Sequence, residues 1–149
     1  MSMMYIPDKF LEHAMPHDGI FIVDVNCQGV IDLAPHQSSW AKKFPNTYKK
    51  YMKSVVTEQI FPGNVSWHVE DEYTIGLITT VDKIVGEDKD THYFTELFTE
   101  ECVKELAAVL KPNDVLLTGI VNRSNSAHHL FVQAVASYGK QQEWLVHRE

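Results

Sequence analysis

The sequence lacks the features of membrane proteins and of disulfide scaffolds. No apolar run approaches the roughly 20 residues of a membrane-spanning helix. The N-terminal segment has neither the basic start nor the long apolar core of a secretion signal. The two cysteines, Cys27 and Cys102, occur in unrelated contexts, so we expect reduced thiols. These absences predict a cytoplasmic protein with no membrane partner.

Basic residues are also scarce. The net charge of −7 argues against nonspecific nucleic-acid binding, because that mode needs a basic surface to displace counterions from phosphates. Direct sequence-specific binding to nucleic acid is not expected either. A single crevice can still be locally positive on an acidic protein, so a nucleotide ligand fits this composition. The 149 residues are 44% hydrophobic and include only seven glycines, which indicates one folded globular domain over residues 1–149.

Apolar runs alternate with helical patterns along the chain, which predicts a layered α/β fold. Strands are expected at Met3–Ile6, Ile20–Val25, Val65–Val69, Tyr73–Thr80, Asp114–Val121 and Glu143–His147. Helices are expected at Lys9–Ala14, at Gln37–Ser54 with a break or kink at Pro45, at His92–Leu110 and at Ala127–Tyr138. Phe98 and Phe131 are expected in the core with Tyr93 and Phe94, whereas Trp144 is a candidate for stacking on a base.

Two strand-to-helix crossings stand out, over residues 26–36 and 121–127. In an open α/β sheet, ligands bind at the carboxyl ends of strands, where such crossings meet. In the first crossing the apolar strand ends in the polar turn Asn26-Cys27-Gln28-Gly29. Unpaired backbone N–H groups and a helix dipole at such a place attract phosphate. We therefore expect the two crossings to form the walls of one anion-binding cleft.

Five segments of the chain carry a family pattern in order: Tyr5–Leu11, Ile22–Val30, Ala41–Pro45 with Tyr48, Pro62–Val65, and Leu77–Thr79. The strongest part is the Asn-Cys-x-Gly-Val turn that begins at Asn26 and is followed by Lys42-Lys43-Phe44-Pro45. Together these segments resemble a macrodomain, and the likeness is greatest to the branch found in bacteria, phages and the terminal ADP-ribose glycohydrolases. The resemblance implies a three-layer α/β/α domain with a central mixed sheet. Its expected partner is ADP-ribose, a related adenine nucleotide or an ADP-ribosylated macromolecule, with no cofactor and no metal.

The resemblance also implies roles for individual residues. Asp8 matches the residue that accepts a hydrogen bond from the adenine amino group, and Asn26 matches the asparagine that faces the distal ribose. Arg123 departs from the glycines usual in the family, and its guanidinium would add a bidentate phosphate contact that glycines lack. The first diphosphate loop corresponds to Gly29, Val30, Ile31, Asp32, Leu33 and Ala34. The second phosphate loop corresponds to Val121, Asn122, Arg123, Ser124, Asn125 and Ser126.

The chain departs from this family pattern in both loops and at the catalytic positions. The first loop has Asp32, Leu33 and Ala34 where further glycines are usual, and the second lacks its Gly-x-Gly run. Thr80 stands where the glycohydrolase branch has a lysine, and no acidic residue lies near Ser126. An active enzyme would therefore need a rearranged constellation of catalytic residues. The candidates for it are Asn26, Asp32, His36 and Lys83.

Three functions remain open on these grounds. The first is a module that binds ADP-ribose or a related adenine nucleotide. The second is a hydrolase that removes ADP-ribose from protein or nucleic acid, or processes an ADP-ribose derivative. The third is a scaffold for protein interactions, with the cleft filled by side chains such as Leu33 and Val121.

Each candidate site residue also has a purely structural interpretation: Asp8 as a helix cap, Asn26 and Gly29 as a simple turn, and Arg123 as a solvated side chain. Oligomeric state and biological setting are left open by the residues.

Overall fold

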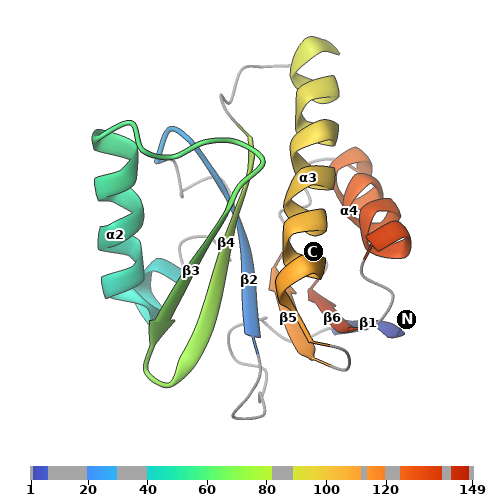
Figure 1. Ribbon diagram of the computed structural model, residues 1–149, viewed down its shortest axis with the longest axis horizontal. Coiled ribbons are helices and arrows are strands. Elements are labelled where there is room, and N and C mark those ends of the chain that lie inside the picture. Colours follow the sequence, from blue (N-terminus) through green and yellow to red (C-terminus); the bar gives the residue numbers. More distant parts are fainter. Residues whose placement is uncertain are drawn as a thin grey trace.

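The computed structural model describes residues 2–6, 20–29, 40–81, 89–111, 114–119, 125–138 and 142–147. These residues form a six-stranded sheet with helices on both faces (Figure 1). The strands are β1 (Ser2–Ile6), β2 (Ile20–Asn26), β3 (Val65–Glu70), β4 (Tyr73–Val81), β5 (Val115–Gly119) and β6 (Glu143–His147). The helices are α2 (Pro45–Val56), α3 (Lys89–Val109) and α4 (Asn125–Tyr138).

The strand order is β1-β6-β5-β2-β4-β3. All neighbouring pairs are parallel except β3 and β4, which form an antiparallel hairpin. In Figure 1, α2 lies on the left of the β3-β4-β2 half of this mixed sheet, and α3 and α4 lie on the right. The predicted α/β/α architecture with a central mixed sheet is confirmed.

Strand β2 is apolar nearly throughout because both of its faces are covered. Phe21, Val23 and Val25 pack toward α2, whereas Ile22 packs toward α3 and α4. The core on the α2 face comprises Phe21, Val23, Val25, Trp40, Phe44, Tyr51, Ile75 and Leu77. The core on the opposite face comprises Ile22, Ile78, Cys102, Val103, Leu106, Leu110, Phe131, Ala134, Val135 and Trp144.

The expected strands and most of the expected helices agree with the structure to within a few residues. The predicted break near Pro45 is confirmed: residues 40–43 form a helical turn, Phe44 is non-helical, and Pro45 begins α2. Proline suits a first helical position because its fixed φ is helical and its missing N–H has no intrahelical partner there. Helix α3 begins at Lys89 rather than at the expected His92, so the helix includes three residues that were not assigned to it. The expected helix at 9–14 lies outside the described residues.

The expectation for Trp144 was wrong. Its side chain is only 1% exposed, and its ring packs edge-on against Phe131 with centroids 5.6 Å apart. A tryptophan buried in this way cannot stack on a ligand. Phe131 is in the core as expected and Phe98 is half-buried, whereas the side chains of Tyr93 and Phe94 lie outside the described part of the structure.

Helix α2 begins without a capping side chain of its own, and Glu70 at the end of β3 supplies one. The non-helical residue before the helix is Phe44, which has no polar side chain. The Glu70 carboxylate accepts hydrogen bonds from the backbone N–H groups of Asn46 at 3.2 Å and Thr47 at 2.7 Å, and from the Thr47 hydroxyl at 2.8 Å. Burial raises the pKa of Glu70, but these hydrogen bonds outweigh it and hold the pKa below its ordinary value.

The turn between β3 and β4 is a two-residue loop in an unfavourable conformation. Glu70 and Tyr73 are paired across the hairpin, and Asp71 and Glu72 between them have φ of 51° and 69°. Positive φ at both central positions is typical of a type I′ turn, which favours Asn-Gly. The acidic pair therefore holds a strained backbone that other residues would adopt more easily.

Replacing Asp71 with Asn and Glu72 with Gly should raise the free energy of unfolding by about 1 kcal/mol, because glycine avoids the steric cost of positive φ. We expect a melting temperature about 2–4 °C higher, measured by thermal denaturation. The control replaces both residues with Gln, which removes the same two charges and keeps the strain. A melting temperature no higher than that of the control would contradict this interpretation of the turn.

The Glu70→Gln substitution should lower the free energy of unfolding at pH 7 by about 1–2 kcal/mol, since it weakens the cap of α2. The folded-state pKa lies below the unfolded-state value of about 4.3, so the contribution is complete above that value and disappears as the pH falls through the folded-state pKa. Urea unfolding should therefore show the two proteins converging in acid. Glu58→Gln, which alters an exposed carboxylate, is the control and should show neither effect.

Candidate functional site

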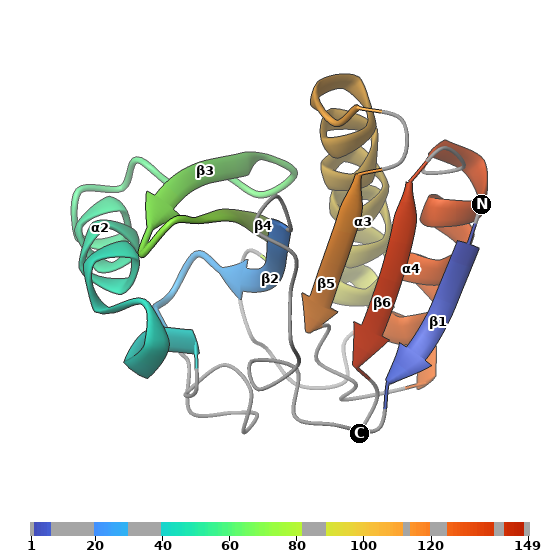
Figure 2. The same ribbon diagram turned by 90° about the horizontal axis from the view of Figure 1, so that it is seen from below.

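The carboxyl ends of β2, β4 and β5 lie at one edge of the sheet, which we call the carboxyl edge. β2 is parallel to both of its neighbours, and Asn26 pairs with Val81 while Val23 pairs with Gly119. The two crossings singled out in the sequence therefore start from adjacent strands. In Figure 2 the N-terminal end of α4 lies at the same end of the molecule as the arrowheads of β5, β6 and β1.

The polar turn after β2 is closed by the side chain of Asn26. This residue is only 4% exposed, and its Oδ1 accepts a hydrogen bond of 2.9 Å from the backbone N–H of Gln28. That bond is an Asx-turn, which reverses the chain directly after the strand. Gly29 completes the turn with a φ of 74°, a value that glycine adopts without strain.

Helix α2 holds this turn from outside the sheet. The Tyr51 hydroxyl donates a hydrogen bond of 2.6 Å to the backbone carbonyl of Asn26 and lies 3.4 Å from its Oδ1. Burial raises the pKa of Tyr51 to about 12, so the phenol remains a protonated donor at physiological pH. A Cβ at Gly29 would lie 3.1 Å from the end of Met52, which shows how closely the turn packs on the helix. The Asn26 turn is thus a fixed element of the carboxyl edge.

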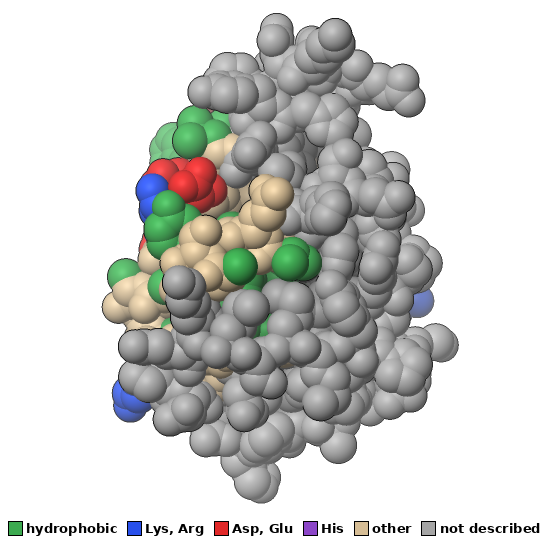
Figure 3. Space-filling model, turned by 90° about the vertical axis from the view of Figure 1, so that its right-hand side faces the viewer, with side chains coloured by type: hydrophobic (Ala, Val, Ile, Leu, Met, Phe, Trp, Pro, Cys, Tyr) green, Lys and Arg blue, Asp and Glu red, His purple; other side chains and the backbone are tan. Residues whose placement is uncertain are grey.

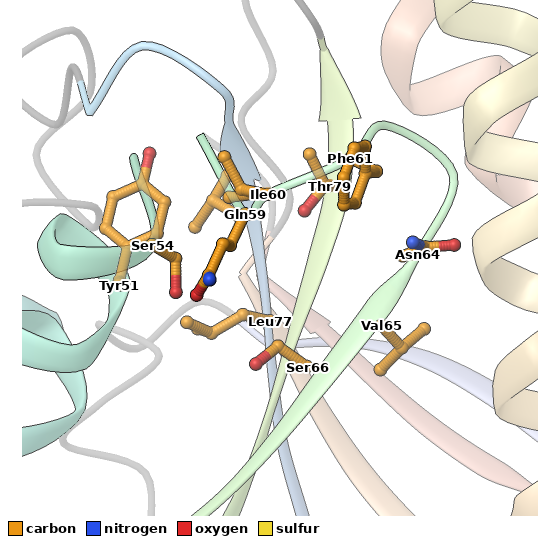
Figure 4. A pocket seen from close by; sticks show the side chains of 11 residues that line it. Tyr51, Ser54, Gln59, Ile60, Phe61, Asn64, Val65, Ser66, Leu77 and Thr79 are labelled. Carbon is orange, nitrogen blue, oxygen red and sulfur yellow. The ribbon is translucent and has the colours of Figure 1, made fainter. Parts of the chain in front are cut away.

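A pocket of about 240 Å³ opens beside this turn (Figure 4). It lies between α2, the segment that joins α2 to β3, and the strands β3 and β4. Sequence reasoning missed it because its lining is spread over residues 25–79 and no local pattern connects these positions. The lining residues are Val25, Tyr51, Ser54, Gln59, Ile60, Phe61, Asn64, Val65, Ser66, Leu77 and Thr79.

The structure places few of the other predicted site residues. Asn125 and Ser126 belong to the first turn of α4, two residues before the start expected from the sequence. Thr80, at the position where the resemblance has a catalytic lysine, is 6% exposed in β4. The remaining candidates lie outside the described residues: Asp8, Val30, Ile31, Asp32, Leu33, Ala34, His36, Lys83, Val121, Asn122, Arg123 and Ser124. Their placement remains a prediction.

Charged side chains on α3 pair with one another. Figure 3 shows acidic and basic side chains side by side on one face of the molecule. The Lys104 ammonium lies 3.8 Å from Glu100 Oε1 and 3.5 Å from Glu101 Oε1, and it also lies 5.1 Å from the centre of the Tyr138 ring. The Tyr138 hydroxyl donates a hydrogen bond of 2.7 Å to Glu100 Oε1. Exposed pairs of this kind contribute little to stability, and they link α3 to α4 rather than form a site.

Neither a metal site nor a membrane-spanning helix occurs in the part of the chain that the structure describes. Within these residues, no group of three or more His, Cys, Asp or Glu side chains is placed to hold a metal ion. None of the described helices is long and apolar enough to cross a bilayer.

Several solved structures with the same fold are macrodomains. A macrodomain protein from Streptomyces coelicolor aligns with a TM-score of 0.74 at 9% identity, over 99% of both chains. The macrodomain of Thermus aquaticus DarG aligns with a TM-score of 0.68 at 16% identity, over 99% of this chain and 98% of that one. Thermosipho africanus DarTG, solved in complex with ADP-ribose, aligns with a TM-score of 0.63 at 10% identity, over 98% of this chain and 41% of that one. No family model and no curated protein matches the sequence.

The chain has the macrodomain fold. The resemblance noted in the sequence is confirmed at this level, because the chain aligns over nearly its whole length with these macrodomains at TM-scores of 0.74 and 0.68.

Tyr51→Phe should destabilise the protein by about 1–3 kcal/mol, because it leaves the buried carbonyl of Asn26 without its tyrosine donor. Urea unfolding measures the change. Tyr48→Phe on the same helix is the matched control, since the Tyr48 ring is half-buried and its hydroxyl makes no hydrogen bond with the described residues. Equal effects of the two substitutions would contradict the anchoring role of Tyr51.

Proposed function

We propose that this protein binds ADP-ribose or a related adenine nucleotide at the carboxyl edge of its sheet. The macrodomain fold is the main support, together with the neighbour from Thermosipho africanus that was solved with ADP-ribose. The edge itself is suited to such a ligand, because the Asn26 turn and the start of α4 follow adjacent parallel strands.

The chemistry of the edge favours a diphosphate. Helix α4 has 14 residues and no acidic side chain in its first turn, so its N-terminal N–H groups and dipole attract an anion without opposing charge from that turn. In the proposed complex, the second phosphate loop from Val121 to Ser126 carries these amides to the ligand. Arg123 in this loop adds a bidentate contact to phosphate oxygens.

The distal ribose of the ligand occupies the first crossing. Asn26 faces the distal ribose, with its side chain held in one orientation by the Gln28 N–H. Gly29 to Ala34 surround the diphosphate from the β2 side, and Asp8 accepts a hydrogen bond from the adenine amino group. The roles of Asp8 and of residues 30–34 rest on the resemblance of the sequence alone, because these residues lie outside the part of the chain that the structure describes.

Binding without catalysis is the favoured form of the proposal. The hydrolytic branch uses a lysine at the end of the strand that corresponds to β4, and this chain has the buried hydroxyl of Thr80 there. A hydroxyl in this position cannot replace an amine as the nucleophile toward an opened ribose. A hydrolase would have to use Asp32, His36 or Lys83 instead.

Arg123→Ala should weaken ADP-ribose binding about tenfold, since it removes one charge-assisted contact worth about 1.4 kcal/mol. Asp8→Ala should weaken it by a similar factor through loss of the adenine contact. Isothermal titration calorimetry measures both, with Lys49→Ala as the control for removing an exposed cation on α2. Unchanged affinity in both variants would refute the placement of adenine and diphosphate.

The same titration and an incubation with ADP-ribosylated protein or nucleic acid together separate the three functions left open by the sequence. No heat and no thermal shift at millimolar ADP-ribose would reject the binding function and leave the scaffold. Release of ADP-ribose from modified protein or nucleic acid would reject binding without catalysis. Saturable binding with no release is the result we expect.

A further inference from the structure

The pocket between α2 and the β3-β4 hairpin is separate from the residues proposed to hold ADP-ribose. Asn26, Gly29 and the first turn of α4 are not among its lining residues. Its volume of about 240 Å³ is below the roughly 300–1,000 Å³ of sites for drug-sized ligands. At about 30 Å³ for a water molecule, the pocket has room for about eight waters or one small ring system.

The pocket carries no charged side chain. Its lining combines apolar residues with hydroxyl and amide groups, and none of the 11 lining residues is acidic or basic. An ionised ligand would lose hydration there without gaining an opposite charge, so the pocket disfavours ions. The Ser54 hydroxyl donates to the carbonyl of Lys50 at 3.0 Å, and the Ser66 hydroxyl pairs with His68 Nε2 at 2.6 Å. Side-chain amides offer both donors and acceptors, which suit a ligand that carries both.

Two of the polar side chains are available to a ligand. The side-chain amides of Gln59 and Asn64 make no hydrogen bond with the residues that the structure describes, although the backbone groups of both residues do. Figure 4 shows the Gln59 side chain extending into the pocket, with its amide beside the Ser54 hydroxyl and above Leu77. A ring with adjacent donor and acceptor atoms would find partners for both at this point.

The apolar part of the lining offers a surface against which a planar ring can pack. Val25 and Leu77 come from the central strands, and Ile60 and Phe61 come from the segment before β3. Phe61 is 58% exposed, which is unusual for so large an apolar side chain. A planar ring packed against it would remove part of this surface from water, and aromatic rings favour such contacts.

The pocket is preformed, because its rim is fixed at both ends. The Gln59 N–H donates to the carbonyl of Ser54 at 2.9 Å, which ties the rim to the end of α2. The Gly63 N–H donates to the carbonyl of Thr79 at 2.7 Å, and the Thr79 N–H donates to the carbonyl of Asn64 at 3.0 Å. A rim tied to α2 and β4 loses little freedom when a ligand binds.

We propose that this pocket is a second ligand site, which takes an uncharged planar heterocycle of nucleobase size with adjacent donor and acceptor groups. The inference goes beyond the proposed function, because it does not depend on ADP-ribose binding at the Asn26 turn.

Uracil is the probe, and orotate, the same ring with a carboxylate, is its charged counterpart. We expect uracil to cause saturable shifts of the backbone amide signals of residues 59–61, Ser66 and Leu77 in the nuclear magnetic resonance spectrum of the labelled protein. Orotate should bind at least tenfold more weakly. No saturable shift with uracil, or equal binding of orotate, would overturn the proposal.

Two variants test the location. Ser66→Tyr places a ring in the pocket from an exposed strand position and should abolish the uracil shifts, whereas Val69→Tyr on the same strand should leave them unchanged. Gln59→Ala should weaken uracil binding several-fold by removing the amide. The dispersion of the spectra checks that each variant is folded. Unaltered uracil binding by Ser66→Tyr would overturn the assignment of the uracil site to this pocket. The affinity for ADP-ribose is measured separately and bears only on the proposed function.

Discussion

The attachment of α2 to the sheet at two points is the constraint on which the geometry of the carboxyl edge depends. At the N-terminal end, the Glu70 carboxylate accepts hydrogen bonds from two backbone N–H groups and one hydroxyl of α2. In the middle of the helix, the Tyr51 hydroxyl donates a hydrogen bond to the backbone carbonyl of Asn26. Because one contact reaches the β3-β4 hairpin and the other reaches the end of β2, the helix cannot shift along the sheet without breaking one of them.

Apolar packing supplies most of the energy that holds α2, and the polar contacts determine its position. Trp40 and Phe44 are fully buried beneath the helix, and the Phe44 and Phe21 rings lie 5.5 Å apart. Burial of one large side chain contributes about 1.5–3 kcal/mol, whereas a hydrogen bond contributes a net 0.5–1.5 kcal/mol or so. Apolar contacts are non-directional, however, so they tolerate small displacements that the bonds of Glu70 and Tyr51 exclude.

Local patterns were sufficient to predict the strands, the break at Pro45 and the start of the polar turn at Asn26. Each of these depends on neighbouring residues: an apolar run, a proline without an N–H, or an Asx-turn two residues long. The cap from Glu70 depends on a partner 23 residues away, and no local pattern reports it. Trp144 was misjudged for a related reason, because an apolar residue in a strand can face either side, and only the packing of Phe131 decides which. The pocket was missed because four separate elements contribute its lining.

The sheet order also gives different parts of the carboxyl edge different electrostatic surroundings. Helix α4 follows β5 and packs on the face opposite α2, so its N-terminal dipole acts at the centre of the edge. The uncharged pocket lies at the other side, under α2 and beside the edge strand β3. Helix dipoles act within about one turn, so the pocket receives little of this field. Phosphate and neutral heterocycle are therefore favoured at different places along one edge, and the Asn26 turn, held by Tyr51, lies between them.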